Sequence, residues 1–255
     1  MLKNKKILIM GIRNKWSIAW GAAQSAYENG AEVIFTFNGE DNREKIEELI
    51  SEIPGSKAYA CGVDSDEEIK EVFEKIKGEY GKIDGILHSI AHANTEDLRN
   101  DFINTSREGF KHAAEISAYS FVAVARMAKQ IDFLNENASL VSLSYFGAEK
   151  VLPGYNIMGV AKSALECSVR YLAENLGKDG IRVNAISAGP IKTLSAKGIK
   201  DFNTILDVVE QKAPLRRNVT AREVGDSVTF MFSNMSNAIT GQIIYADCGY
   251  SIMGI

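Results

Sequence analysis

Short, wholly apolar runs alternate with longer segments of helical periodicity along the chain, and this alternation constrains the fold more than any other feature. The runs at residues 7–10 and 33–35 carry no polar side chain that could face water. Such runs are typical of parallel strands that helices cover on both faces of a sheet. The alternation extends over 255 residues without a linker or repeat. We therefore expect an α/β fold, a single Rossmann-type doubly wound domain spanning residues 1–255, with a mostly parallel sheet of seven strands.

The expected elements follow from the same pattern. The strands are Lys6–Met10, Glu32–Phe37, Lys57–Cys61, Ile83–Ile90, Ser139–Leu143, Arg182–Ser187 and Gln242–Tyr245. The helical segments lie near Ser17–Asn29, Asn42–Ile50, Asp66–Tyr80, Glu108–Ile131, Tyr155–Leu176 and Ala221–Ser233. Capping boxes are indicated at Ser65-x-x-Glu68 and Thr220-x-x-Glu223. Glycines stand where three helices should end, at Gly30, Gly81 and Gly177.

Charge and cysteine content argue against several classes of protein. A formal net charge of −4 does not suit a nucleic-acid-binding or membrane-surface protein, which would carry a basic excess. The three cysteines form no C-x-x-C or Cys/His pattern, so no metal site is expected, and a cytoplasmic location fits their sparse use. The apolar run at residues 7–10 is too short for a signal peptide. No stretch approaches the roughly 20 apolar residues of a membrane span.

In a doubly wound sheet, ligands bind beyond the carboxyl ends of the strands, so the residues that follow each strand are the candidates for a site. After the first strand, the segment from Gly11 to Ser17 leads into a helix. The N–H groups and dipole at such a helix start suit a pyrophosphate, and Ser17 can cap the helix. The segment is not a G-x-G-x-x-G motif, so an ordinary strand–turn–helix remains the alternative.

The end of the second strand bears on the choice of dinucleotide. Asn38 can bond ribose hydroxyls, and the acidic Glu40 and Asp41 would repel a 2′-phosphate, which favours NADH. Arg43 and Lys15 are basic and support the alternative, NADPH.

The residues after the fourth, fifth and sixth strands include further candidates for the site. His88 and His92 flank the small residues after the fourth strand and are general-base candidates, although no nucleophile motif accompanies them. His112 lies in a helical segment and is expected to be on the surface or packed. Tyr145 follows the fifth strand, and after the sixth Ile191 and Thr193 precede a poorly periodic segment. We expect a substrate-binding lid at about 191–205.

Tyr155 and Lys162 are the pair with the clearest chemical meaning. They stand seven positions apart in a helical segment, so both side chains lie on one face, about 10 Å apart along the axis. This geometry suits a lysine that holds a nicotinamide ribose and a phenol that meets a substrate oxygen. A packed ring beside a solvated amine is the structural alternative.

Together these residues resemble the short-chain dehydrogenase/reductase superfamily and, within it, the bacterial enoyl-acyl-carrier-protein reductases of type II fatty acid synthesis. The resemblance covers essentially the whole chain. Its motifs are Gly11-x5-Ser17-Ile18-Ala19, His88-Ser89-Ile90, Leu143-Ser144-Tyr145, Tyr155-Asn156-x-Met158-Gly159-x-Ala161-Lys162 and the run from Arg182 to Thr193. The tyrosine–lysine spacing discriminates, because ketoacyl reductases of the superfamily use Tyr-x-x-x-Lys and Met158 stands four before Lys162.

The resemblance implies hydride transfer from NADH, with NADPH less favoured, to the β-carbon of a trans-2-enoyl thioester. Tyr155 would stabilise the enolate, Lys162 would hold the ribose, and Tyr145 would complete the catalytic set beside the thioester. The implied cofactor contacts are Gly11, Ser17, Ile18, Asn38, Val63, Ser89, Ile90, Lys162, Ile191 and Thr193. The implied substrate contacts are Ala93, Tyr145, Tyr155 and Phe202.

The resemblance also implies an acyl carrier protein as the partner that brings the thioester, and a homotetramer. The chain departs from the family pattern at Gly62, Ala91 and Cys248, and in the polar Asn203 and Thr204 after Phe202. Basic residues often help to recruit the carrier in that region, and the remaining candidates are Lys192, Lys197 and Lys200. The rival hypotheses are a reductase of another activated alkene or carbonyl, and a non-catalytic dinucleotide-binding regulator.

Overall fold

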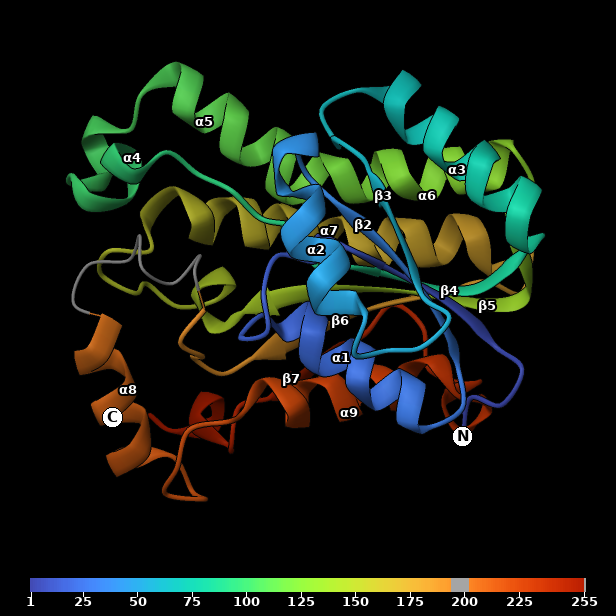
Figure 1. Ribbon diagram of the computed structural model, residues 1–255. Helices are drawn as coiled ribbons and strands as arrows, with labels where there is room; N and C mark the ends of the chain where they lie inside the picture. The colour runs from blue at the N-terminus through green and yellow to red at the C-terminus, as the bar shows by residue number, and fades with distance from the viewer. Residues whose placement is uncertain (194–201, 255) are drawn as a thin grey trace.

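A computed structural model describes residues 1–193 and 202–254 of the chain. Its centre is one sheet of seven strands in the order β3-β2-β1-β4-β5-β6-β7, and every neighbouring pair is parallel (Figure 1). The strand order reverses direction between β1 and β4, which is the switch point of a doubly wound sheet. The expected fold class is therefore confirmed, and the sheet is wholly parallel.

The strands fall close to their expected positions. They are β1 (Lys6–Met10), β2 (Glu32–Phe37), β3 (Lys57–Ala60), β4 (Ile83–His88), β5 (Leu134–Tyr145), β6 (Arg182–Ala188) and β7 (Ile243–Ala246). The strand β5 begins earlier than its apolar run, because Leu134 already pairs with Ile83 of β4, and a register shift precedes the pairing of Ser139 with Gly85.

Helices cover both faces of the sheet (Figure 1). They are α1 (Ile18–Glu28), α2 (Arg43–Ile50), α3 (Asp66–Tyr80), α4 (Thr95–Arg99), α5 (Arg107–Ala114), α6 (Ser120–Gln130), α7 (Asn156–Gly177), α8 (Phe202–Lys212) and α9 (Ala221–Phe232). A π-helical segment, η3 (Glu115–Tyr119), joins α5 to α6. Short 3₁₀ turns are η1 (Glu40–Asn42), η2 (Phe102–Asn104), η4 (Phe146–Ala148), η6 (Asn234–Ser236) and η7 (Tyr250–Ile252).

The two faces of the sheet bury two separate apolar cores. Along β1, Ile7 and Ile9 pack in the core beneath α1, α2 and α9, whereas Leu8 and Met10 pack in the core beneath α3, α6 and α7. Because side chains alternate along a strand, a strand covered on both faces must be apolar throughout, as this one is.

Three helical expectations need correction. The segment Glu108–Ile131 is three elements rather than one helix, because a π-helical turn interrupts it without a break in apolar periodicity. The helices α4 and α8 were not expected. Gly177 is the last residue of α7, and the left-handed glycine in this turn is Gly180, with φ of 74°.

The helix starts are capped largely as expected. Ser17 and Ser65 each accept a hydrogen bond from a first-turn backbone N–H of α1 and α3. At α9, Thr220 and Glu223 form the complete capping box. At α3, Glu68 does not return its carboxylate to Ser65 and accepts from the N–H of Gly62 instead, at 2.6 Å.

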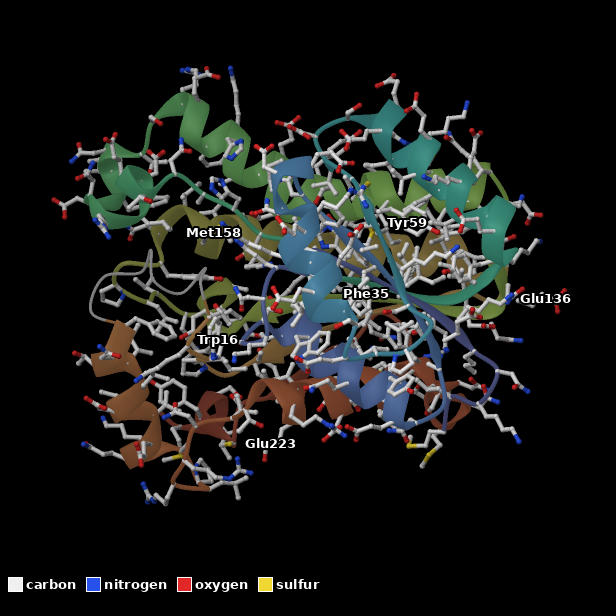
Figure 2. The ribbon with its side chains drawn as sticks, in the orientation of Figure 1. Trp16, Phe35, Tyr59, Glu136, Met158 and Glu223 are labelled. Atoms are coloured by element: carbon white, nitrogen blue, oxygen red, sulfur yellow. The ribbon has the colours of Figure 1, made fainter. Side chains whose placement is uncertain are left out.

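The carboxyl ends of the strands lie at the end of the molecule where α4 and α8 are found (Figure 1). In Figure 2, Trp16 and Met158 lie toward this end, and Glu136 on β5 lies at the opposite end. Within residues 1–193 and 202–254, no helix is long and apolar enough to cross a membrane.

Candidate active site

One cleft of about 750 Å³ opens at the carboxyl ends of the strands. The loop after β1, the loop after β4, the ends of β5 and β6, and the helices α4, α5, α7 and α8 all contribute to its walls. Every residue predicted for the site lines this cleft: Gly11, Ser17, Ile18, Asn38, Val63, Ser89, Ile90, Ala93, Tyr145, Tyr155, Lys162, Ile191, Thr193 and Phe202. The structure thus brings together segments that are up to about 190 positions apart in the sequence.

The loop after β1 leaves no room for a side chain at Gly11. A Cβ there would lie 2.6 Å from the carbonyl oxygen of Ser89, and φ is +87°, a conformation that favours glycine. The N–H groups of Gly11 and Ile12 both donate to the carbonyl oxygen of Thr36, so these two groups are not available to a ligand. The free donors in the described structure are instead the first N–H groups of α1, after its cap Ser17.

Lys162 lies on α7 and Tyr155 directly precedes this helix, and both residues line the cleft. Tyr155 occupies the cap position before the helix and is 8% exposed, and Lys162 is 5% exposed. Lys162 Nζ donates to the carbonyl oxygen of Leu143 at 2.8 Å, which ties the lysine to the end of β5. In the described structure, the Tyr155 hydroxyl has no hydrogen-bond partner, so it is available to a ligand oxygen.

Burial sets the charge state of this pair. It lowers the pKa of Lys162 to about 8, against the opposing effect of the Glu166 carboxylate. Burial raises the pKa of Tyr155 well above its usual range, and the electrostatic effects of Tyr145 and of the Glu166 carboxylate act in the same direction. Tyr155 is therefore a neutral hydrogen-bond donor at neutral pH.

Tyr145 stands against Tyr155 in an edge-to-face arrangement, with ring centroids 4.9 Å apart and planes at 70°. The turn η4 follows Tyr145, and at Gly147 a Cβ would lie only 2.4 Å from Cδ1 of Tyr155. Ser163 on α7 donates to the carbonyl of Ala148 in the same turn. Tyr155 is thus held between the ring of Tyr145 and the backbone of the turn η4.

Glu166 is a buried acid beside the pair that sequence analysis missed. It lies one helical turn after Lys162 on α7 and accepts a hydrogen bond from the hydroxyl of Ser144. Burial raises the pKa of its carboxyl group. Its spacing of four residues from Lys162 on a predicted helix was the available signal.

His88 is structural rather than catalytic. It is fully buried beside Ser142 and Ser120, and burial lowers its pKa to about 3, so it stays neutral. The single hydroxyl proton of Ser120 goes to the carbonyl of Ile116, so Nε2 of His88 must donate to Ser120, at 2.8 Å. This bond joins the end of β4 to the helix that follows the π-helical turn.

His92 and His112, by contrast, both line the cleft, and their rings are bonded to each other. His112 was expected only as a surface or packing residue. This contact could not be predicted from the sequence, because only the fold brings α5 and the loop after β4 together.

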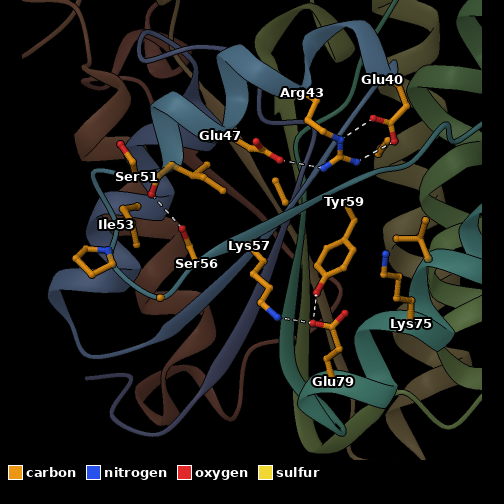
Figure 3. Close-up of a pocket in the computed structure, with 16 residues that line it drawn as sticks. Glu40, Arg43, Glu47, Ser51, Ile53, Ser56, Lys57, Tyr59, Lys75 and Glu79 are labelled. Atoms are coloured by element: carbon orange, nitrogen blue, oxygen red, sulfur yellow. Dashed lines mark hydrogen bonds and ion pairs between the residues drawn. The ribbon is translucent and has the colours of Figure 1, made fainter.

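The ribose end of the cleft carries Asn38, which is exposed at the end of β2. Arg43 is turned away to a second hollow of about 560 Å³ along the edge strand β3 (Figure 3). There its guanidinium bonds Glu40 at 2.7 and 2.8 Å and Glu47 at 3.3 Å. Lys57 in the same hollow is likewise paired with Glu79. Because these charged groups bind one another, they are not available to bind a ligand or to act in a reaction.

The remaining expectations concern the departures and the lid. At Gly62, a Cβ would lie 2.9 Å from carboxylate oxygens of both Asp64 and Glu68, so acidic groups already fill that space. Ala91 packs beside Tyr145 and Tyr155. Residues 194–201 of the expected lid, with Lys197 and Lys200, lie outside the described residues. Residues 202–205 form the first turn of α8, and Phe202 there lines the cleft.

Comparisons with known proteins agree with this geometry. The model of a family described as enoyl-(acyl carrier protein) reductase matches residues 11–251. Among curated proteins, an NADH enoyl-acyl-carrier-protein reductase of Bacillus cereus is 49% identical, with 100% of this chain and 99% of that protein covered. An NADPH enoyl-acyl-carrier-protein reductase of Staphylococcus aureus is also 49% identical, with 98% and 97% covered.

A solved structure gives the same result for the fold. The crystal structure of the Bacillus cereus enoyl-acyl carrier protein reductase with NADP⁺ and indole naphthyridinone superposes with a TM-score of 0.97. The two sequences are 50% identical, and the match covers 100% of this chain and 99% of that one.

Proposed function

The chain belongs to the enoyl-acyl-carrier-protein reductase family, and from that premise we propose how its own residues carry out the reaction. It reduces the double bond of a trans-2-enoyl thioester in fatty acid synthesis, with NADH as the hydride donor. We propose that Tyr155, Lys162 and Tyr145 are the catalytic residues, and that residues 1–255 act as one unit that binds both cofactor and substrate.

The cleft fits a dinucleotide on structural grounds. Close approach of a ligand to the loop after β1 is possible because Gly11 has no side chain, and the start of α1 offers free N–H groups to a pyrophosphate. Lys162 would hold the ribose next to the nicotinamide, and Ile191 and Thr193 would meet the carboxamide. When bound, NADH supplies the hydride for the reaction.

The preference for NADH rests on the far end of the cleft. Asn38 is neutral there, and the guanidinium of Arg43 is already bonded to Glu40 and Glu47 (Figure 3). A 2′-phosphate would have to compete with two carboxylates for that arginine. We therefore propose NADH as the cofactor, with NADPH the less favoured alternative.

The free hydroxyl of Tyr155 is the observation that carries the catalytic assignment. As hydride reaches the β-carbon, negative charge develops on the thioester oxygen, and a neutral phenol donates a hydrogen bond to it. The α-carbon then takes a proton to complete the saturated thioester. The positive charge of Lys162, present below a pH of about 8, favours the developing anion.

We further propose that the thioester arrives on an acyl carrier protein, that the protein acts in the cytoplasm, and that it forms a homotetramer. The carrier is implied by the family, and Lys192 is an exposed cation at the rim of the cleft. The long helix α7 exposes Tyr171 and Val160, which would suit a subunit contact.

Two substitutions test the catalytic roles. Tyr155→Phe should lower kcat by about 10²–10³-fold, the usual loss for one donor to a developing oxyanion, while the NADH dissociation constant stays near wild type. Tyr27→Phe makes the same change at an exposed site on α1 and is the matched control. Unchanged turnover in Tyr155→Phe would remove this residue from the mechanism.

Lys162→Ala should chiefly weaken NADH binding, measured by the fluorescence of the bound nicotinamide. A wild-type dissociation constant would contradict the ribose assignment.

A further inference from the structure

Three basic side chains gather at the mouth of the cleft, and the mechanism above does not use them. Arg13 comes from the loop between β1 and α1, His92 from the loop after β4, and His112 from α5. All three line the same cleft. We refer to these three residues as the basic rim.

The backbone of His92 is fixed by a fully buried hydroxyl. Its N–H donates to Oγ of Ser117 at 2.9 Å, and that hydroxyl donates back to the carbonyl of His92, also at 2.9 Å. Ser117 belongs to the π-helical turn η3, so this turn places the loop. These bonds hold the backbone that carries the imidazole of His92.

The two imidazoles are held together at the rim. Nδ1 of His92 lies 2.7 Å from Nε2 of His112, and the rings meet edge to face with centroids 5.0 Å apart. Only one proton can lie between these two nitrogens. The other ring nitrogens, Nε2 of His92 and Nδ1 of His112, make no bond in the described structure, and when protonated they can donate to a ligand.

No side chain of the basic rim forms an ion pair in the described part of the chain. Arg13 has no hydrogen bond or ion pair among the residues that the structure describes. Burial lowers the pKa of His92, and the positive charges of His112 and Arg13 lower it further. A bound anion would relieve this repulsion, whereas the guanidinium would repel a cation.

The shape and chemistry of the rim suit a phosphate group. A guanidinium and imidazole N–H groups are preferred donors to phosphate oxygens, and Arg13 can bind two of them at once. We propose that Arg13, His92 and His112 form a binding site for a phosphate group at the mouth of the cleft. The phosphate would come from the phosphopantetheine arm of the thioester or from the diphosphate of the dinucleotide. This inference rests on the proposed function for the identity of those two ligands.

Three titrations distinguish the two sources. Binding of 4′-phosphopantetheine, of pantetheine and of NADH is measured by calorimetry for wild type, Arg13→Ala and His92→Ala. Pantetheine differs from 4′-phosphopantetheine only by its lack of a phosphate. Lys111→Ala is the matched control, because it removes a cation from α5 next to His112 that is paired with Glu108 on the surface.

If the thioester arm is the source, both rim variants should weaken 4′-phosphopantetheine binding about tenfold and leave pantetheine unchanged, as expected for a lost charge-assisted hydrogen bond. If the dinucleotide is the source, the same loss should appear in the NADH titration alone. The proposal is overturned if neither phosphate ligand is weakened in the rim variants, or if Lys111→Ala weakens them equally.

A kinetic experiment separates this proposal from the proposed function. Crotonyl-CoA and crotonyl-N-acetylcysteamine carry the same acyl group, but only the first bears phosphates. Failure of the wild-type protein to reduce either thioester would refute the reductase assignment, and the titrations would still decide the site. If both are reduced and the thioester arm is the source of the phosphate, the rim variants should raise the ratio of KM for crotonyl-CoA to KM for crotonyl-N-acetylcysteamine about tenfold.

Discussion

The substitution Gly147→Ala tests whether the position of Tyr155, rather than its presence, controls the reaction. The added Cβ would lie 2.4 Å from Cδ1 of Tyr155, whereas ordinary contacts begin at 3.4 Å. The turn η4 cannot easily move aside, because Ser163 holds its backbone and Gly159 of α7 already lies against the carbonyl of Gly147. The phenol ring must therefore shift by about 1 Å, a displacement that can cost about 10²-fold in rate.

The assay for this variant has three measurements. The value of kcat, followed by the loss of NADH absorbance with an enoyl thioester, should fall about 10²-fold. The NADH dissociation constant should stay near wild type, because Lys162 keeps its own contact with Leu143. Overpacking should cost about 1–3 kcal/mol and lower Tm by roughly 2–12 °C. The control is Gly177→Ala at the end of α7, where a Cβ meets no atom within 4 Å. A normal kcat in Gly147→Ala, together with a lowered Tm, would refute the reasoning.

Further predictions concern pH, cofactor choice and stability. Because the pKa of Lys162 is lowered to about 8, its charge is lost above that pH, and kcat/KM should fall as pH rises through this value. A kcat/KM that stays constant up to pH 10 would contradict this, because it would place the pKa of Lys162 near the usual value of about 10.4 for lysine. Glu40→Ala should leave Arg43 bonded to Glu47 alone and lower KM for NADPH more than KM for NADH, and equal effects on both would argue against the arginine's role. Thr220→Ala should destabilise the protein by about 1 kcal/mol, seen as a Tm lower by roughly 2–4 °C, through loss of the capping box. Gly78→Ala within α3 should add about 0.5–1 kcal/mol, since its Cβ meets no neighbouring atom, and a lower Tm would contradict that.

Strand positions could be predicted well because a strand buried on both faces must be apolar throughout. The bounds of β1 and β2 are those expected, whereas β5 begins earlier, because Leu134 already pairs with β4 and the polar residues 135–137 lie in the register shift that follows. The break between α5 and α6 could not be predicted, because a π-helical turn adds a residue without removing the apolar pattern. The helix α8 could have been predicted, because Phe202, Ile205, Leu206 and Val209 follow the spacing of one face of a helix. It was missed because the beginning of this segment was assigned to the lid.

The predicted residues that follow a strand lie together in one cleft, because the carboxyl ends of parallel strands meet at one edge of the sheet. Tyr155, Lys162 and Phe202 lie on or beside helices, and they were predicted from the tyrosine–lysine spacing and from the resemblance to the family. Contacts between distant side chains could not be predicted in this way. Two such contacts are the bond between His92 and His112 and the bond from the backbone of His92 to Ser117. Both depend on how α5 and η3 pack against the loop after β4. The pairing of Arg43 with Glu40 likewise became visible only in three dimensions.

The buried tyrosine–lysine pair should support reduction of an enoyl thioester by NADH. This is tested by following NADH oxidation by the purified protein with crotonyl-CoA, and by repeating the assay with NADPH and with acetoacetyl-CoA. We expect turnover of the enoyl thioester, faster with NADH than with NADPH, and none of the keto thioester. Turnover of acetoacetyl-CoA alone would contradict this expectation, because the pair would then act on a carbonyl rather than on a conjugated double bond.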